Sequence, residues 1–298
     1  MTGTVFDIGY QRYDGVREGR GRARRAIFKD GLRAALGFGR PPRAKVLPWF
    51  FLFVLVFIAL VMALVAGAAD RMMGEGAAAR MNLPSHIDYY GVASIIMFVF
   101  AAVVAPELLC RDKRERVINL YLVRPLTGSD YVISRWLAFF AVMVAAAWLP
   151  QFILFLGLAG GHARPLEYVQ LYWLDVPRFL LSGFAFAAYL TTLALLVASF
   201  TSRRAYASVF LVGLVAITAP FTLGLSQEIE GSVGEWLSMF ALTNIPLHVN
   251  DVIFGELSEL TEDIPGSRLA ASTKVIWYLA WTVGPAALLW SRYRRLTP

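Results

Sequence analysis

Charged residues are scarce in this sequence. Asp, Glu, Lys and Arg make up 16% of its 298 residues, against about 25% in a typical soluble domain. Hydrophobic residues make up 58%, and they gather in blocks long enough to cross a bilayer, which a soluble core does not need. The composition therefore excludes a disordered chain and predicts an integral membrane protein.

The sequence also lacks the residues of several kinds of site. Its single cysteine, Cys110, excludes an intrachain disulfide and a cysteine-based metal cluster. There is no Gly-x-x-x-x-Gly-Lys-Ser/Thr loop to hold the phosphates of ATP, and no Gly-x-Ser-x-Gly turn to hold a nucleophilic serine. We expect that this chain does not hydrolyse ATP by itself and binds neither a cofactor nor a metal ion.

Only three histidines occur, His86, His162 and His248. None has the His-Glu-x-x-His spacing that would place two metal ligands on one face of a helix. All three fall in predicted outer loops, and we predict that they are solvated.

Six apolar segments are long enough to cross the roughly 30 Å hydrocarbon layer as helices. They are 46–68, 90–110, 133–158, 178–200, 205–225 and 272–291. The predicted fold is an all-α integral membrane protein with one six-helix transmembrane domain over 46–291. A basic segment, 1–45, precedes this domain, and a cytoplasmic tail, 292–298, follows it.

Lys and Arg are distributed unevenly between the two sides of the predicted bundle. With the N-terminus inside, the segments 1–45, 111–132, 201–204 and 292–298 hold about 21 of the 28 basic residues. Basic residues favour the cytoplasmic side of a membrane, so we expect both termini in the cytoplasm. The first 45 residues contain no apolar h-region, and we expect no signal peptide. The net charge of +7 then follows from topology and requires no nucleic-acid partner.

The predicted outer segment 226–271 is acidic, with eight Asp and Glu residues. Within it, Trp236–Phe254 is apolar enough to be mistaken for a seventh span. Asn244, His248 and Asp251 interrupt it, and polar groups are costly at the centre of a bilayer. We therefore predict interfacial or re-entrant helices between the fifth and sixth spans.

The loop after the second span is the most informative stretch. Arg111 with Glu115, and Asp112 with Arg116, stand four residues apart, a spacing that allows pairing along one helix face. Apolar residues follow up to Pro125, where a helix must stop. This pattern predicts a short amphipathic helix on the cytoplasmic surface. The residues alone leave open a solvated charged loop lying on anionic headgroups.

A run of motifs continues through this loop. They are Pro106-Glu107, Arg111-Asp112-Lys113-Arg114, Leu120-Tyr121-Leu122, Arg124-Pro125-Leu126 and Tyr131. Their order resembles the loop between spans two and three of ABC-2 type transporter permeases, and the six predicted spans fit that family. The opening stretch from Tyr10 to Arg20 also resembles the start of its bacterial members.

The resemblance implies a permease subunit of an exporter in the bacterial cytoplasmic membrane. Two permease subunits, identical or related, would pair among the membrane lipids, and separate nucleotide-binding subunits holding ATP and Mg²⁺ would dock from the cytoplasm. The family's coupling helix would correspond to the 111–124 loop. Its coupling residues would be Arg111, Asp112, Lys113, Arg114, Glu115, Arg116, Leu120, Tyr121 and Arg124.

Family resemblance also implies an amphipathic elbow helix before the first span. Ile27, Leu32 and Leu36 lie among Arg24, Lys29, Arg33 and Arg40 and suit such a helix. The alternative is a basic tail held to anionic lipid.

Glu107 is the one carboxylate that falls well inside a predicted span. Such a group usually faces a protein interior or an aqueous pathway, so Glu107 is a candidate gate residue. The alternative is a boundary carboxylate paired with Arg111. Two other functions stay open at this point: an intramembrane enzyme that uses Glu107 with His248, and a membrane scaffold without transport.

Overall fold

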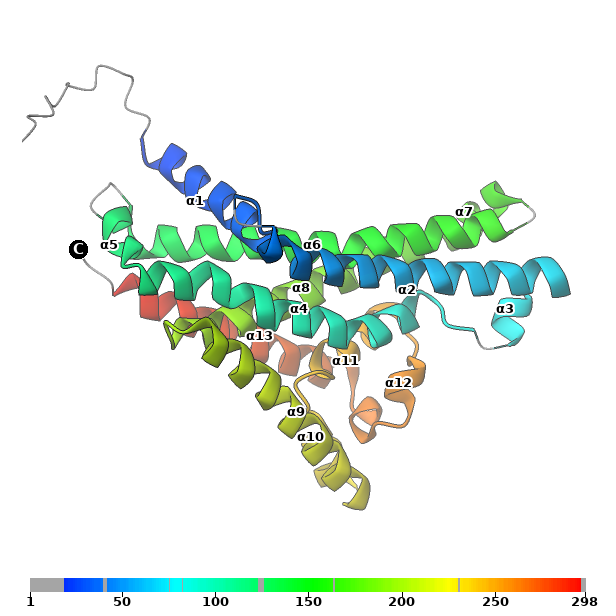
Figure 1. Ribbon diagram of the computed structural model, residues 1–298. Helices are drawn as coiled ribbons and strands as arrows, with labels where there is room; N and C mark the ends of the chain where they lie inside the picture. The colour runs from blue at the N-terminus through cyan, green and yellow to red at the C-terminus, as the bar shows by residue number, and fades with distance from the viewer. Residues whose placement is uncertain are drawn as a thin grey trace, which may run out of the picture.

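A computed structural model of the chain describes residues 19–39, 42–74, 76–81, 83–122, 126–162, 164–229 and 231–295. Within these ranges the regular structure is helical, and the described residues form no strand. The helices in Figure 1 are α1 (Arg20–Ala35), α2 (Arg43–Met73), α3 (Ala77–Arg80), α4 (His86–Arg114), α5 (Val117–Leu122), α6 (Gly128–Gly161), α7 (Pro165–Tyr172), α8 (Asp175–Ser199), α9 (Arg204–Glu228), α10 (Ser232–Ser238), α11 (Ile245–Phe254), α12 (Glu259–Glu262), the 3₁₀ helix η1 (Pro265–Arg268) and α13 (Ala271–Arg294).

Five helices, α2, α4, α6, α8 and α9, are long and apolar enough to cross a membrane. The shortest, α8 and α9, have 25 residues each. At a rise of 1.5 Å per residue each is about 37 Å long, more than the hydrocarbon thickness. The first five predicted spans are therefore confirmed as apolar helices of membrane-spanning length.

The sixth predicted span, 272–291, forms a single helix, α13, of 24 residues. Length and composition alone do not mark α13 as a candidate span, because Lys274 lies in its first turn and two arginines lie in its last. Lys274 is buried and donates to the carbonyl oxygen of Ser267 at 2.8 Å, so its charge is held by protein. A membrane crossing by α13 stays a prediction.

Helices α4 and α6 form the centre of the bundle. Helix α6 contacts α1, α2, α4, α7, α8 and α13, and α4 contacts α1, α2, α5, α6, α8, α9, α11 and α12. Helix α9 packs against α4 and α8 but slants away from the bundle along its length (Figure 1). Most of its apolar side chains are consequently on the surface. Its buried residues are Ala207, Leu211, Thr222 and Ser226.

The segment between α9 and α13 is broken, as predicted. The stretch Trp236–Phe254 is divided between α10 and α11, with turns between them, so it does not form a single long helix. Helix α11 packs against α4, α8 and α13 instead of lying on the surface. Its Asn250 is fully buried; Nδ2 donates to the carbonyl of Ile87 at 3.1 Å, and Oδ1 accepts from Ser182 at 2.5 Å. These bonds explain how a polar residue is accommodated in the bundle.

The prediction that the histidines are solvated is wrong for two of the three. His86 is buried at the start of α4, and His248 is buried on α11. Burial first, and then the positive charge of Lys274, lowers the pKa of His248 to about 4, so its ring is neutral near pH 7. His86 was misplaced because α4 begins at residue 86, before the predicted span 90–110. His248 was misplaced because α11 packs inside the bundle instead of lying at the membrane interface.

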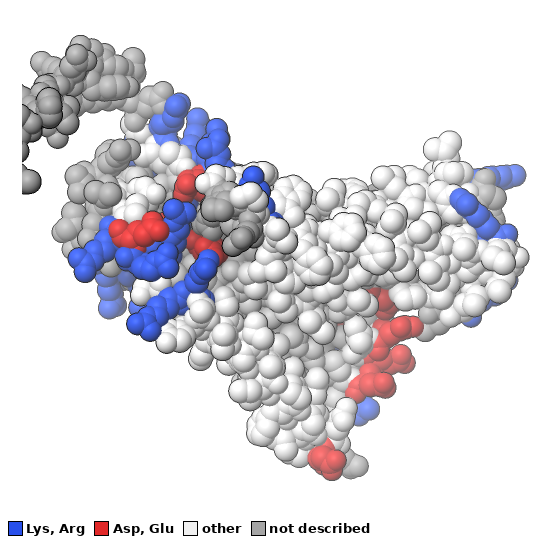
Figure 2. Space-filling model, in the orientation of Figure 1, with Lys and Arg blue, Asp and Glu red and all other residues white. Residues whose placement is uncertain are grey.

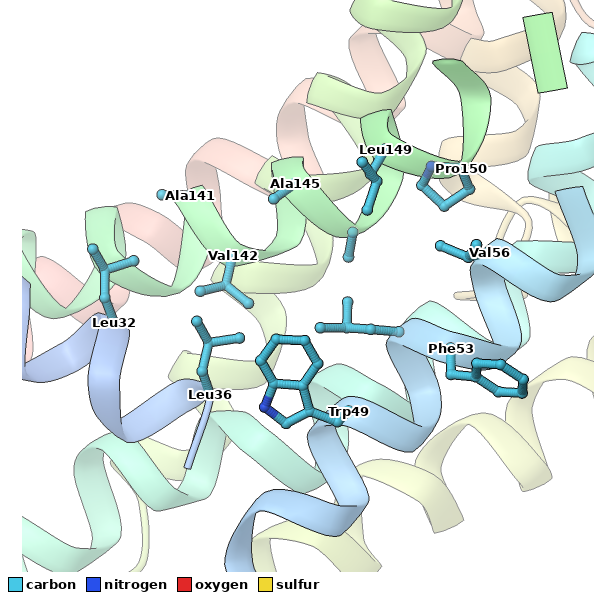
Figure 3. Close-up of a pocket in the computed structure, with 12 residues that line it drawn as sticks. Leu32, Leu36, Trp49, Phe53, Val56, Ala141, Val142, Ala145, Leu149 and Pro150 are labelled. Carbon is cyan, nitrogen blue, oxygen red and sulfur yellow. The ribbon is translucent and has the colours of Figure 1, made fainter. Parts of the chain in front are cut away.

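The predicted elbow helix forms as α1, although Arg40 and the motif before residue 19 lie outside the described residues. Helix α1 buries Ile27, Gly31 and Ala35 and packs against α6 and α4. It leaves an apolar cavity of about 500 Å³ between α1, α2 and α6. Figure 3 shows Leu36 and Val142 facing this space, and its lining fits hydrocarbon better than a polar ligand.

Substitution of Gly31 by valine is expected to detach α1 from α6. A Cβ atom at Gly31 would lie 2.7 Å from the Cβ of Ala138, and overpacking of this kind costs about 1–3 kcal/mol. Trypsin should then cleave the arginines of α1 faster than in the native chain. Gly21→Val is the control, because no atom lies within 4 Å of its added Cβ. Equal cleavage rates for the two variants would contradict the assigned packing.

Candidate functional site

One end of the bundle carries a concentration of Lys and Arg, and we call it the basic end. It is formed by α1, α5, the first turns of α6 and α9, and the last turns of α4 and α13. Figure 2 shows basic side chains clustered there, whereas the middle of the bundle is almost free of charge. We call the opposite end, where α3 and α7 lie in Figure 1, the distal end.

The predicted coupling segment forms a corner instead of one continuous helix. Helix α4 runs on to Arg114, the chain turns through Glu115 and Arg116, and the short helix α5 begins at Val117. Arg116 has a φ of 55°, a left-handed conformation that costs a non-glycine residue about 1–2 kcal/mol. We call residues 111–122 the α4–α5 corner.

Only one of the two predicted ion pairs of this corner is formed. Arg111 Nε lies 3.2 Å from Glu115 Oε1, as the four-residue spacing predicts. Asp112 instead turns inward, where its Oδ2 accepts from Tyr131 and from Arg135 Nη2, both at 2.7 Å. The prediction of an Asp112–Arg116 pair fails because the turn at Arg116 ends the helix that would have aligned the two side chains.

Arg135, in the second turn of α6, is the hub of a buried ionic network. Its side chain is almost completely buried, with 1% of the residue exposed. Besides Asp112 it contacts Asp30 of α1, with Nη1 2.9 Å from Oδ2. One guanidinium therefore joins α1, α4 and α6 through two carboxylates, and its planar shape allows it to serve both at once.

Aromatic rings extend this network to α5 and α13. The ring of Tyr131 stacks on Tyr121 of α5 at 5.9 Å between centroids, and it lies 5.7 Å from Tyr293 of α13. Lys113 Nζ lies 5.5 Å from the centre of the Tyr293 ring and donates to the carbonyl of Ser199 at the end of α8. Through Tyr131, helix α5 is therefore linked to Asp112 of α4 and to Tyr293 of α13.

The start of α6 is also tied to α1. Thr127 and Asp130 form a reciprocal capping box at its first turn. Asp130 Oδ2 in addition accepts from Arg20 Nε at 2.7 Å, and Arg24 Nε lies 3.6 Å from Oδ1. A carboxylate in this position also interacts favourably with the helix dipole.

Glu107 lies near the basic end. Its Oε1 accepts from Arg204 Nη1 at 2.6 Å, which links α4 to the first turn of α9. Arg111, the partner predicted from sequence, pairs with Glu115. The position of Glu107 makes it a link between helices at one end of the bundle rather than a group in mid-bundle.

The predicted coupling residues differ in their accessibility. Arg111, Arg114, Glu115 and Arg116 are exposed, whereas Asp112 is buried and Lys113 and Tyr121 are half-buried. The side chain of Leu120 and all of Arg124 lie outside the described residues. The exposed set is therefore available to a partner, and the buried set holds the corner to the bundle.

No catalytic arrangement emerges among the described residues. They contain no group of three His, Cys, Asp or Glu residues that would hold a metal ion. Asn250, two residues after His248, bonds to Ile87 at the start of α4, and Glu107 follows twenty residues later on that helix. Glu107 and His248 thus lie about 30 Å apart, which contradicts a joint role in an enzyme.

The sequence reasoning missed Arg135 and Asp30. A charged residue within a predicted span was an available signal, because such residues usually pair inside the bundle. Arg135 lay only two residues from the start of the predicted third span. Its partners on α1 and α4 are distant in sequence, so no local pattern indicates them.

Comparison with known protein families identifies the family of this chain. The model of the ABC-2 family transporter protein matches residues 83–290, from just before α4 to the last turns of α13. Comparison with curated protein sequences gives no match. Because the matched region covers more than two thirds of the chain and holds both the corner and its helices, the chain belongs to the ABC-2 transporter family, as a membrane transport component rather than an enzyme.

Proposed function

We propose that this chain is the permease subunit of an ATP-driven exporter of the bacterial cytoplasmic membrane, and that a separate nucleotide-binding subunit docks on its α4–α5 corner. The observation that carries the proposal is the two-sided construction of the corner. Arg111, Arg114 and Arg116 face outward, while Asp112 fixes the same segment to Arg135 inside.

Such a corner suits the transmission of motion. Helix α5 is joined by short chain connections to α4 on one side and to α6 on the other, so a push on it acts on both long helices. Rigid-body displacement of packed helices is a common way to convert a local event into a change of state. The ionic network fixes the α4 side of the corner, because Asp112 bonds to Tyr131 and Arg135 in the low-dielectric interior. Helix α5 packs on this network through the ring pair of Tyr121 and Tyr131.

The positive charge of the α4–α5 corner also supports docking of the nucleotide-binding subunit there. Three exposed guanidinium groups on one corner favour a partner with an acidic groove, since complementary charge fixes orientation and speeds association.

We also infer that two permease subunits, identical or related, pair in the complex. The slanting helix α9 exposes apolar side chains such as Val209, Phe210 and Ile217. A second copy packed against α9 would cover this surface, and the pair would enclose the pathway for the substrate. Chemical cross-linking of the purified complex followed by mass measurement tests the permease stoichiometry.

Co-purification tests the main proposal. The full chain is expressed with the nucleotide-binding subunit of its own transporter, and only the chain carries an affinity tag. We expect the subunit to be retained through size-exclusion chromatography in detergent, with ATPase activity in the same fraction. A chain that folds but retains no such subunit would instead support a scaffold without transport.

A further inference from the structure

The distal end contains a polar cavity that the proposed function does not use. It has a volume of about 340 Å³, within the range of small-molecule sites. The ends of α2 and α6, the starts of α4 and α8, and helix α7 surround it. Its lining includes Asp70, His86, His162, Tyr168, Asp175 and Arg178.

His86 presents a hydrogen-bond acceptor that has no partner among the described residues. Its Nδ1 lies 2.7 Å from Gln151 Oε1, while Gln151 Nε2 donates to the His86 carbonyl oxygen at 3.0 Å. This arrangement fixes the proton of the neutral ring on Nδ1 and leaves Nε2 as an acceptor. His86 is only 4% exposed, and Nε2 is buried and unpaired. A buried acceptor without a partner is unfavourable, and His86 belongs to the lining of the cavity. A donor group that reaches Nε2 would therefore be stabilised.

Carboxylates give the cavity a negative balance. Three carboxylates, Asp70, Asp175 and Glu256, line it. The described lining residues include one arginine, Arg178. Arg178 is paired with Asp175 at 3.1 Å. Asp70 accepts from the amide of Ala78 at 2.9 Å through Oδ1, and its Oδ2 lies 3.7 Å from His162 Nδ1. Asp70 thus keeps acceptor capacity that these contacts do not fill.

Aromatic rings form one wall. Tyr168 lies 4.6 Å from Tyr172 and 5.0 Å from His162 between ring centroids. Burial, followed by Asp175, Tyr172 and Asp70, raises the pKa of Tyr168, which agrees with a negative local potential. Faces of tyrosine rings attract organic cations.

We propose that this distal cavity binds an organic amine in its ammonium form, with N–H groups donated to His86 Nε2 and Asp70 and the hydrocarbon part against Tyr168. Acceptors, negative charge and an aromatic wall all fit this class of ligand. A metal ion fits less well, since the described residues include no cluster of three ligating side chains. The amine has two sources, a free molecule or the headgroup of an aminophospholipid.

The test uses the full chain in nanodiscs of phosphatidylcholine and phosphatidylglycerol, and it needs no ATPase subunit. Benzylammonium is titrated by calorimetry, with benzyltrimethylammonium and benzoate as comparison probes. We expect saturable binding of benzylammonium and none of benzoate. Asp70→Asn should weaken the binding of benzylammonium by about tenfold or more, because the hydrogen bond to a charged group is lost. The control is Asp263→Asn, which removes an exposed carboxylate outside the cavity. It should change the affinity for benzylammonium less than twofold.

His86→Phe separates hydrogen bonding from a general loss of structure. Phenylalanine preserves a ring beside Phe179, on which His86 stacks at 5.4 Å. This variant should weaken the binding of benzylammonium about tenfold. The affinity for benzyltrimethylammonium, which has no N–H, should stay within twofold of the native value. Absence of saturable binding to the native chain, or equal losses for both cations, would overturn the proposal.

A second arm identifies the source of the amine. Phosphatidylethanolamine is added to the same nanodiscs before the titration. Competition with benzylammonium would assign the cavity to a lipid headgroup, and unchanged affinity would assign it to a free amine. If Asp70→Asn and Asp263→Asn weakened benzylammonium binding equally, the effect would come from the overall surface charge. That result would overturn the proposed site.

Discussion

Replacement of Arg135 by methionine is expected to destabilise the protein by about 3–5 kcal/mol, the cost of leaving a buried charge without its partner. Asp112 is the group left behind, because its side chain is 11% exposed, whereas the side chain of Asp30 is 59% exposed and can turn to water. The measurement is the unfolding midpoint of the purified chain, followed by tryptophan fluorescence, together with the yield of monodisperse protein.

Two further variants isolate the charge from the packing. Asp112→Asn combined with Arg135→Met removes both charges and should recover part of the lost stability. Arg111→Met breaks only the exposed pair with Glu115 and should cost less than about 1 kcal/mol. A native midpoint for Arg135→Met, or a double variant no more stable than the single one, would contradict the role given to the network.

Reversal of charge at two exposed positions of the corner is expected to have the second largest effect. Arg114→Glu with Arg116→Glu should weaken retention of the nucleotide-binding subunit by more than about tenfold, which corresponds to about 1.4 kcal/mol, because two contacts become repulsive. Both side chains are exposed, so membrane insertion and the unfolding midpoint should stay close to native. Retention is measured by tagged co-purification at two salt concentrations.

The matched control reverses two arginines at the distal end. Arg80→Glu with Arg164→Glu makes the same change in net charge, on α3 and beside α7, and both residues are exposed. The control should retain the subunit as the native chain does. Equal loss in the two double variants would assign the effect to net charge, and normal transport by the corner variant would contradict the coupling assignment.

The long helices were predictable because a bilayer imposes a simple rule of length and hydrophobicity. That rule also separated Trp236–Phe254 from a true span, since its polar residues interrupt the apolar run. The same rule predicted a sixth span at 272–291, and a membrane crossing by α13 stays a prediction. Lys274 lowers the hydropathy of this helix although its ammonium is bonded inside the protein. A hydropathy average depends on residue types alone and contains no information about such hydrogen bonds.

The candidate site was predictable only in outline. Motifs located the corner, and the four-residue rule identified the Arg111–Glu115 pair. The rule failed for Asp112 because it assumes an unbroken helix, whereas the chain turns at Arg116. The contact of Arg135 with Asp30 depends on how α1 lies against α6, and no local pattern encodes that packing.

A site-specific cross-link tests the central claim most directly. Cys110 is the one cysteine of the chain and is 1% exposed, so Arg116→Cys introduces the accessible thiol. A photoreactive maleimide on this thiol is activated in the co-expressed complex, with Arg164→Cys as the distal control. The account predicts a covalent product with the nucleotide-binding subunit from residue 116 and none from residue 164. A product from residue 164 alone, or from neither position in an intact complex, would contradict it.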